Sequence, residues 1–254
     1  MLPVVAKQAD LTLSEVEQGL CEEPEDGGSQ ALVVVLRKTQ HPACLKDLRS
    51  CGTDYVPYGK ATRMAETEAE LENQCETQLT QVRCTSSFAG RCLEQLPRVV
   101  GLLAYHAAEE DIEAICTPDT EIRQQYQDSV QCMNAAGVQL NVCLKTAFES
   151  FEGIVANVTR KEKINYACCH YHNLLDCLQT AVKDCDHTPA LEFLTSVNEH
   201  IFGQVLSLVC GVHSRGSDAC KKLPPLPPVA PGGADIGNFL EPIIDIANSL
   251  RGGK

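Results

Sequence analysis

Fifteen cysteines in a chain of 254 residues constrain the fold more than any other feature of this sequence. A chain of this length buries most of its unfolded surface, so it can form a core without covalent cross-links. Each disulfide therefore adds stability to that core, typically about 2–4 kcal/mol. Disulfides persist in oxidising compartments and outside the cell. The cysteine content therefore predicts a secreted, extracellular protein.

Two groups of four cysteines repeat nearly the same spacing, with intervals of 9, 8 and 24 residues in the first and 9, 8 and 25 in the second. The groups are Cys75, Cys84, Cys92 and Cys116, and Cys168, Cys177, Cys185 and Cys210. Each cysteine of the second group follows its counterpart in the first by 93 or 94 residues, and Cys143 follows Cys51 by 92 residues. Between its last two cysteines, each group has an amphipathic pattern introduced by a proline, Pro97 or Pro189. This agreement predicts an internal duplication.

The duplication, together with a change of composition after Cys220, divides the chain into four parts. These are an N-terminal segment (1–20), a first cysteine-rich helical repeat (21–117), a second repeat (118–220), and a proline-rich linker with a short C-terminal helix (221–254). The run KKLPPLPPVAPGG is extended and stiff. We expect it to lay the last helix, which has Pro242 near its first turn, on the body of the protein or on a partner.

Apolar residues at three- and four-residue intervals predict an all-α fold. The clearest pattern lies in 190–210, where Thr188 and Pro189 give a start signal and Gly211 a stop signal. Its apolar stripe consists of Leu191, Leu194, Val197, Ile201, Val205 and Leu208. Helices are also expected in 32–36, 61–83, 98–116, 119–135, 138–151 and 160–183. The predicted fold is a disulfide-stapled helical bundle of two duplicated repeats with a proline-rich C-terminal tail.

The segment CCHYH at 168–172 raises the question of whether its cysteines bind a metal, act as catalytic thiols or form disulfides. Structural zinc sites use paired C-x2-4-C and H-x3-5-H elements, and the spacing here does not fit. Adjacent helical side chains point about 100° apart. Their Cα atoms, about 3.8 Å apart, are closer than the roughly 4.4 Å that a disulfide normally needs. We therefore favour two separate disulfides, from Cys168 and Cys169 to two other helices, over the metal and thiol alternatives.

All cysteines but one are expected to form disulfides: Cys44, Cys51, Cys75, Cys84, Cys92, Cys116, Cys132, Cys143, Cys168, Cys169, Cys177, Cys185, Cys210 and Cys220. The odd total leaves one sulfur free or bonded to another chain. Cys21 is the best candidate because it lies near a terminus, beside the acidic segment EEPEDGG. An exposed thiol is reactive in an oxidising fluid. We expect Cys21 to be capped or to link two chains as a disulfide-linked homodimer.

The sequence contains no recognisable catalytic motif: no G-x-S-x-G, no H-E-x-x-H, no Walker loop and no dinucleotide fingerprint. Two polar groups have suggestive spacing, His106 with Glu109 and Glu110, and His213 with Ser214 and Asp218. The first is typical of a solvated helix face. The second lies between two cysteines, in a turn that disulfides are expected to tie. We therefore predict that the protein is not an enzyme and has no catalytic residue, metal site or cofactor.

Charge and hydropathy limit the partners. The formal net charge of −13 argues against nucleic acid, which needs clustered Lys and Arg. No apolar run approaches the roughly 20 residues of a membrane span. The sequon Asn157-Val158-Thr159 predicts N-glycosylation at Asn157 and fits secretion. The opening residues lack the basic start and apolar core of a signal peptide, so we expect the numbering to begin at or near a mature N-terminus.

Amphipathic helices ending in cysteine occur at RCLEQLPRVVGLLAYHAAEEDIEAIC, and a vicinal cysteine pair at YACCHYHNLLDCLQTAVKDC is followed by EFLTSVNEHIFGQVLSLVC. In these features the sequence resembles the 27 kDa haemolymph glycoproteins of arthropods, a family of secreted, cysteine-rich helical proteins. The resemblance covers roughly 70–220 and rests on the cysteine pattern, while the proline-rich tail and the N-terminal cysteines depart from it. It implies a circulating or matrix glycoprotein without catalytic activity.

Three functions of different classes follow. The leading hypothesis is an extracellular, non-catalytic binding or carrier protein of a body fluid or matrix. Its partner would be an apolar small molecule held between helices, or another extracellular protein. The second is a structural or storage component assembled through intermolecular disulfides, which the odd cysteine favours. The third is an enzyme or enzyme inhibitor, which the missing motifs disfavour.

Overall fold

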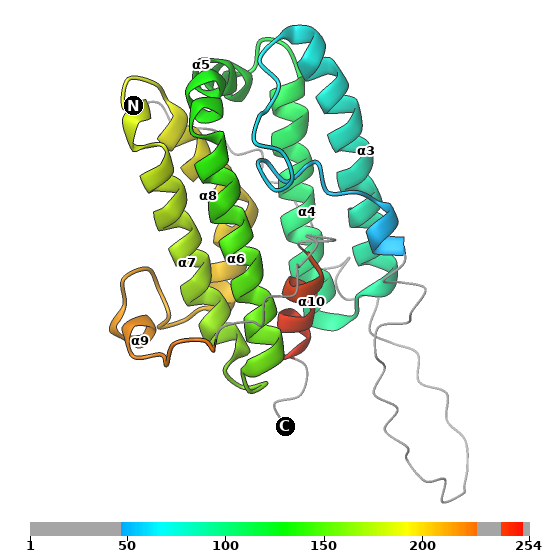
Figure 1. The fold of residues 1–254 in the computed structure, drawn as a ribbon. Helices are drawn as coiled ribbons and strands as arrows, with labels where there is room; N and C mark the ends of the chain where they lie inside the picture. The colour runs from blue at the N-terminus through cyan, green and yellow to red at the C-terminus, as the bar shows by residue number, and fades with distance from the viewer. Residues whose placement is uncertain (1–46, 228–239, 251–254) are drawn as a thin grey trace, which may run out of the picture. The chain divides into compact units, whose positions relative to one another are not determined.

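The computed structural model describes residues 47–227 and 240–250, and in these residues it confirms the predicted all-α fold, with no strand (Figure 1). Residues 47–50 are helical. The later elements are α3 (Glu68–Cys92), α4 (Gln95–Cys116), α5 (Glu121–Ala135), α6 (Gly137–Asn157), α7 (Lys163–Ala181), the 3-10 turn η1 (Lys183–Cys185), α8 (Ala190–Val209), α9 (Asp218–Lys221) and α10 (Leu240–Asn248). The helix expected at 32–36, Cys21 and Cys44 lie outside the described residues.

The long helices pack side by side as antiparallel neighbours (Figure 1). Short connections reverse the chain between α3 and α4 and between α6 and α7, and each of these pairs packs along its length. α8 packs against both α4 and α5. α5 follows the end of α4 and contacts η1, which directly precedes α8. The end of α4 therefore lies near the start of α8, and the two helices run in opposite directions.

Side chains, rather than helix propensity, set the start of α3. The segment 61–83 is free of Gly and Pro and predicts a helix from its first residue, but α3 begins only at Glu68. Thr67 Oγ1 accepts a hydrogen bond from Glu70 N (3.3 Å), and Glu70 Oε2 accepts one from Thr67 N (3.1 Å). This capping box satisfies backbone donors that the first turn leaves unpaired. It therefore places the helix boundary later than predicted.

The main core lies between α5, α6, α7 and the non-helical stretch 52–66. α6 is longer than its predicted counterpart 138–151, because buried Phe151 and Ile154 continue its apolar face by another turn. The largest fully buried side chains of the described residues include Phe88, Leu48, Met133, Leu140, Ile154 and Val82. They are mostly aliphatic, as the scarcity of aromatic residues implies.

Side-chain amides hold the non-helical stretch 52–66 in place. Asn141 Nδ2 on α6 donates to the carbonyl oxygen of Tyr58 at 2.7 Å. The amide of Asn134 on α5 bonds both backbone groups of Met64, accepting from its N–H at 2.8 Å and donating to its carbonyl at 2.9 Å. Buried backbone groups need such partners. The stretch can therefore be buried without regular secondary structure.

Close backbone contact explains the glycine at the first position of α6. A Cβ atom at Gly137 would lie 1.9 Å from the carbonyl oxygen of Thr62. Real Cβ atoms do not approach a backbone oxygen so closely, and only glycine fits without a shift of the chain. Gly137 thus lets α6 start directly against the 52–66 stretch.

Only part of the apolar stripe expected on α8 packs against the core, through Leu194 and Val197. Only Ala190 and Phe193 of α8 are buried, whereas Leu191 and Leu208 keep 41% and 69% of their surface exposed. The other stripe residues are half-buried. α8 rests on α4 and α5 along one side and leaves apolar surface open. Neither α8 nor any other helix of the described residues is long and apolar enough to cross a membrane.

The C-terminal helix α10 packs on α4, α6 and α7. Ile244 and Ile246 are each 4% exposed and join the buried clusters. Arg49 donates two hydrogen bonds to the carboxylate of Glu241, at 2.6 and 2.9 Å. The last helix therefore lies on the body of the protein, although residues 228–239 of the connecting run lie outside the described residues.

Candidate functional site

Six disulfides join helices and turns of the described residues: Cys51–Cys84, Cys75–Cys116, Cys132–Cys185, Cys143–Cys177, Cys168–Cys210 and Cys169–Cys220. Cys168 and Cys169 are neighbours on α7, yet they bond to different partners, at the end of α8 and in α9. Six bridges in one chain are typical of a protein of an oxidising compartment.

Two pairs of bridges connect corresponding positions of the repeated spacing. Cys51–Cys84 and Cys143–Cys177 span 33 and 34 residues, and Cys75–Cys116 and Cys168–Cys210 span 41 and 42. In each pair of helices, one bridge runs from the second half of the first helix (α3 or α7) to the chain before it. The other runs from the first half of that helix to the end of the next (α4 or α8).

The histidines beside the vicinal cysteines are partly buried on α7. Burial lowers the pKa of both His170 and His172 below its ordinary value. The two cysteine sulfurs are committed to disulfides. Within residues 47–227 and 240–250, no three His, Cys, Asp or Glu side chains are grouped so that they could hold a metal ion.

The segment 210–220 is docked on α7 by two disulfides and one ion pair. Arg215 Nε donates to Asp176 Oδ1 at 2.7 Å, and Arg215 Nη2 donates to Gln179 Oε1 at 2.8 Å. Asp218 begins α9 and lies 3.3 Å from Lys221 Nζ. Among the hydrogen bonds of the described residues, none joins the side chains of the candidate group His213, Ser214 and Asp218. The fold therefore places these residues in one turn without arranging them as a triad.

The candidate group on α4 is divided between different neighbours. His106 is exposed, and Glu109 accepts a hydrogen bond from Arg83 Nε on α3 at 2.6 Å. Glu110 instead approaches His200 on α8, with 3.5 Å between Oε2 and Nε2. Helical spacing brought these residues to one side of α4, but tertiary packing gave two of them different partners.

A close polar contact between α4 and α8 was not predicted from the sequence. His200 Nδ1 lies 2.7 Å from Asp111 Oδ1, and the Asp111 side chain is only 10% exposed. Burial raises the pKa of the Asp111 carboxyl above its ordinary value, and the bond to His200 opposes this shift. The other ring nitrogen of His200 faces Glu110 rather than a hydroxyl or thiol. This geometry supplies a polar link between the two helices.

Asn157 is the last residue of α6, whereas the sequence places it in a gap between two helices. The longer α6 accounts for the difference. The Asn157 side chain is exposed, and Thr159 Oγ1 of the same sequon donates to Glu162 Oε2 at 2.7 Å. The acceptor amide is therefore on the surface at a helix end.

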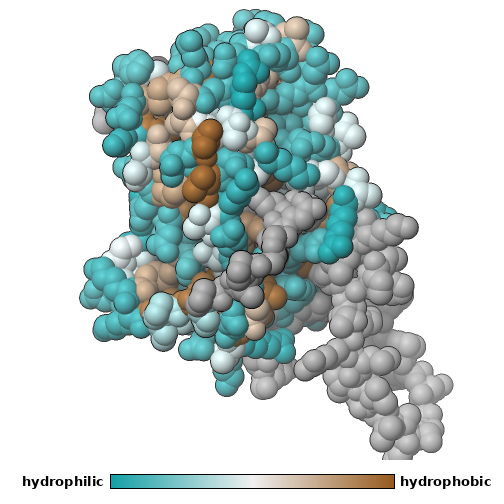
Figure 2. All heavy atoms as spheres, viewed as in Figure 1, coloured by the Kyte–Doolittle hydropathy of each residue, from teal (hydrophilic) through white to brown (hydrophobic). Residues whose placement is uncertain are grey.

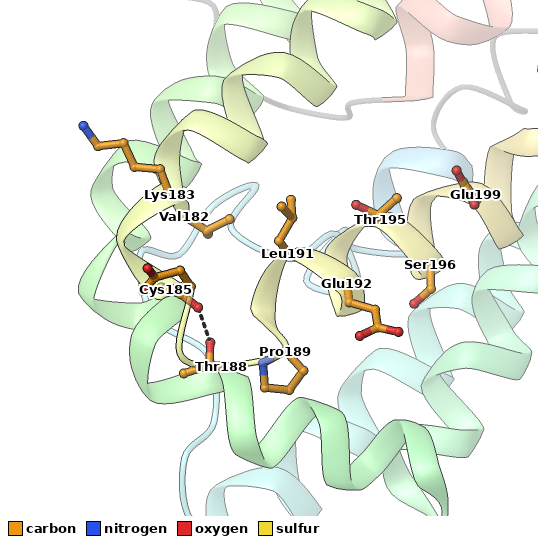
Figure 3. Close-up of a pocket in the computed structure, with 11 residues that line it drawn as sticks. Val182, Lys183, Cys185, Thr188, Pro189, Leu191, Glu192, Thr195, Ser196 and Glu199 are labelled. Atoms are coloured by element: carbon orange, nitrogen blue, oxygen red, sulfur yellow. Dashed lines mark hydrogen bonds between the residues drawn. The ribbon is translucent and has the colours of Figure 1, made fainter. Parts of the chain in front are cut away.

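A surface pocket lies where η1 meets the first turns of α8 (Figure 3). Val182, Pro189 and Leu191 form its apolar part, and the side chain of Lys183 points away from it. Its remaining residues include three carboxylates, Asp186, Glu192 and Glu199. The pocket opens to solvent and is not an apolar chamber between helices, so it does not match the expected carrier cavity.

Exposed apolar side chains occur on both α4 and α8, two helices that pack against each other. Leu96 and Val99 on α4 are 42% and 47% exposed, and Leu208 on α8 is 69% exposed. Leu103 on α4 and Ile201 and Val205 on α8 are half-buried. We call these six residues the α4–α8 surface. By contrast, the view in Figure 2 is dominated by hydrophilic side chains, with hydrophobic ones in small separate groups.

Comparison of the chain with protein-family models, with curated proteins and with solved structures found no match. Functional inference for this protein therefore rests on its own residues and geometry.

Proposed function

We propose that this protein is a secreted, non-catalytic binding glycoprotein that binds another extracellular protein through the α4–α8 surface. The exposure of Leu96, Val99 and Leu208 on two packed helices carries this proposal. Single exposed apolar side chains are common, but a group of them on adjoining elements is typical of an interaction site.

The chemistry of the surface indicates the kind of partner. A small apolar ligand would need an enclosed chamber, whereas the pocket between η1 and α8 is open and bordered by carboxylates. The α4–α8 surface instead offers Leu and Val side chains, with Glu110 at its edge, on a chain whose net charge is −13. We propose a partner with an apolar helix face flanked by Lys or Arg, because opposite charge speeds and orients association.

Secretion is supported by the six disulfides, which an oxidising compartment preserves. The exposed Asn157 is accessible for N-glycosylation. The resemblance to arthropod 27 kDa haemolymph glycoproteins agrees with both proposals. Expression in a eukaryotic secretory host should give a protein whose mass falls on deglycosylation and whose Asn157→Gln variant lacks that glycan. An unmodified Asn157 would remove this support.

We also propose that the chain arose by duplication of a helical cysteine-rich unit. The support is two matched pairs of bridges, Cys51–Cys84 with Cys143–Cys177 and Cys75–Cys116 with Cys168–Cys210. Matched spacing alone constrains the sequence, but matched connectivity also requires that corresponding cysteines meet corresponding partners in space. α3 and α4 would then be the counterparts of α7 and α8.

The binding role can be tested by cross-linking the native fluid of the source organism and mapping the linked peptides by mass spectrometry. We expect links from the α4–α8 surface to an apolar, basic-flanked segment of one partner. The double variant Val99→Lys/Leu208→Lys should weaken binding of that partner at least about tenfold, since two buried apolar contacts are lost. The matched control is Val138→Lys/Val142→Lys, which alters two exposed valines on α6.

Three results would overturn the binding role. The first is equal loss of binding in the α6 control. The second is a set of links from the α4–α8 surface to a second copy of the chain, which would show self-association. The third is a set of links to the chain's own residues before position 47, which would show that the surface is covered internally. Far-ultraviolet circular dichroism of both variants should match that of the parent protein, so that unfolding is not read as lost binding.

A structural or storage component is the second candidate, because fifteen cysteines leave at least one sulfur for a bond to another chain. Non-reducing electrophoresis separates this candidate from the first. A covalent series of oligomers that collapses on reduction would favour assembly, and a monomer that carries a non-covalent partner would favour binding.

A further inference from the structure

Cys92 is disulfide-bonded, like every other cysteine of the described residues. The other twelve pair among themselves in six bridges. The partner of Cys92 is therefore one of the two cysteines outside the described residues, Cys21 or Cys44. The choice also decides which sulfur of the chain is the odd one.

We propose that Cys44 bonds to Cys92 and that Cys21 is the sulfur left without an intrachain partner. The first argument is the reach of the chain. Asp47 Oδ2 lies 3.8 Å from Arg91 Nη1, and Leu48 is fully buried in a cluster with Leu93, so the chain at 47–48 already lies beside the end of α3. Three residues span at most about 11 Å.

A span of this length lets Cys44 reach Cys92 without any rearrangement of the chain at 47–48. Cys21 is separated from Asp47 by a much longer piece of chain. The entropy lost on closing a loop rises with its length, so the near cysteine forms the bridge at lower cost.

The second argument is the repeated bridge pattern, and it is independent of the first. Cys92 corresponds to Cys185 in the repeated spacing, and Cys185 bonds to Cys132. Cys132 is the cysteine that immediately precedes Cys143 in the chain, and Cys44 is the one that immediately precedes Cys51. A Cys44–Cys92 bridge therefore completes a third matched pair, with Cys132–Cys185. A Cys21–Cys92 bridge would break the correspondence.

The bridge forms by oxidation of two thiols. Each sulfur loses a proton, and the two electrons pass to a disulfide-exchange oxidant of the secretory pathway, whose own disulfide becomes two thiols. Cys21 then remains as the sulfur that can exchange with a small thiol or with another chain. This assignment concerns the covalent framework and does not depend on the proposed binding role.

Trypsin separates the relevant cysteines, which makes the test direct. Cleavage after Lys and Arg places Cys44 in peptide 39–46, Cys92 in peptide 92–98 and Cys21 in peptide 8–37. Protein secreted from a eukaryotic host is alkylated without reduction, digested and analysed by mass spectrometry. We expect peptide 39–46 linked to peptide 92–98, with peptide 8–37 alkylated, capped or linked to its own copy. A link between 8–37 and 92–98 would overturn the assignment.

The variant Cys21→Ser gives a second readout. If Cys44 bonds to Cys92, this variant has no thiol that reacts with a maleimide under denaturing, non-reducing conditions, and the 39–46 to 92–98 link is unchanged. If Cys21 bonds to Cys92, the parent protein itself carries its maleimide-reactive thiol in peptide 39–46 rather than in peptide 8–37. Cys132→Ser is the matched control, because loss of that known partner should expose a thiol at Cys185.

Discussion

The region 47–116 and the region 121–220 carry disulfides at corresponding positions. The chain between these positions has a different conformation in the two regions. In the second region Cys143 lies on the long helix α6, whose buried side chains form much of the main core. In the first region the chain that follows Cys51 is the non-helical stretch 52–66, which side-chain amides hold in place. Bridges fix the separation of a few Cα atoms, and the difference shows that the backbone between those atoms remains free to change.

The largest expected effect tests whether the corresponding bridges are equivalent. Cys75–Cys116 and Cys168–Cys210 span 41 and 42 residues, so loop closure predicts that loss of either costs about 4 kcal/mol. The double variants Cys75→Ala/Cys116→Ala and Cys168→Ala/Cys210→Ala should therefore lose similar free energies of unfolding in urea titrations. A difference above about 2 kcal/mol would show that the two regions use their bridges differently.

A smaller effect tests the contact between α6 and the 52–66 stretch. Gly137→Ala places a methyl group against the carbonyl of Thr62, so the backbone must shift, and we expect a loss of about 2–3 kcal/mol. Gly203→Ala on α8 is the control, because no atom lies within 4 Å of the added Cβ. That change should be neutral or stabilise the protein by about 0.5–1 kcal/mol. Equal thermal shifts for the two variants would contradict the close contact.

The next effect in size is the loss of stability on removing the Asn141 side-chain amide, which bonds backbone carbonyls of the non-helical stretch 52–66. Asn141 Nδ2 donates to the carbonyl oxygens of Tyr58 and Gly59, at 2.7 and 3.1 Å. Asn141→Ala leaves both acceptors without this donor, and we expect a loss of about 2 kcal/mol in chemical denaturation. Hydrogen exchange should rise in 52–66 more than in α7. Uniform exchange throughout the chain would show that the stretch does not depend on this amide.

The smallest effect concerns the link between the two regions, Asp111 on α4 and His200 on α8. Burial raises the folded-state pKa of Asp111, so the folded protein holds this proton more readily than the unfolded chain does. The free energy of unfolding should therefore fall as pH rises from about 3.9, the ordinary value, to the higher folded-state pKa.

Asp111→Asn should remove that part of the slope, measured by urea titrations between about pH 3.5 and pH 6.5. Asp218→Asn, at an exposed carboxylate of α9, is the control. An unchanged slope in Asp111→Asn would show that the carboxyl titrates alike in the folded and unfolded states.

The helices could be predicted because their signals are local. Apolar periodicity located α4, α5, α7 and α8 to within a few residues, and geometry alone showed that adjacent Cys168 and Cys169 need separate partners. The late start of α3 required recognition of the capping box at Thr67 and Glu70. That signal is also present in the sequence.

The polar contacts could not be predicted because they join distant residues. Asp111 and His200 are separated by 89 residues. The guanidinium of Arg123 donates to the carbonyl oxygens of Ile115 and Cys116 and so caps α4 from the next helix, a contact that depends on the angle between the two helices. The exposure of apolar residues on α8 also could not be predicted, because it depends on which distant helices pack against α8. An apolar stripe shows that a helix is amphipathic, but not whether a neighbour covers it.

The distribution of the bridges has a consequence for cleavage of the chain. Among the described residues, no disulfide joins 47–116 to 121–220, and the turn at 117–120 is the only backbone connection between them, with exposed residues at Thr117, Pro118 and Asp119. A protease cut in this turn would leave two separately cross-linked halves that adhere only through non-covalent contacts. The uncut protein unfolds as one molecule, but the nicked protein would dissociate on dilution, as a split protein does.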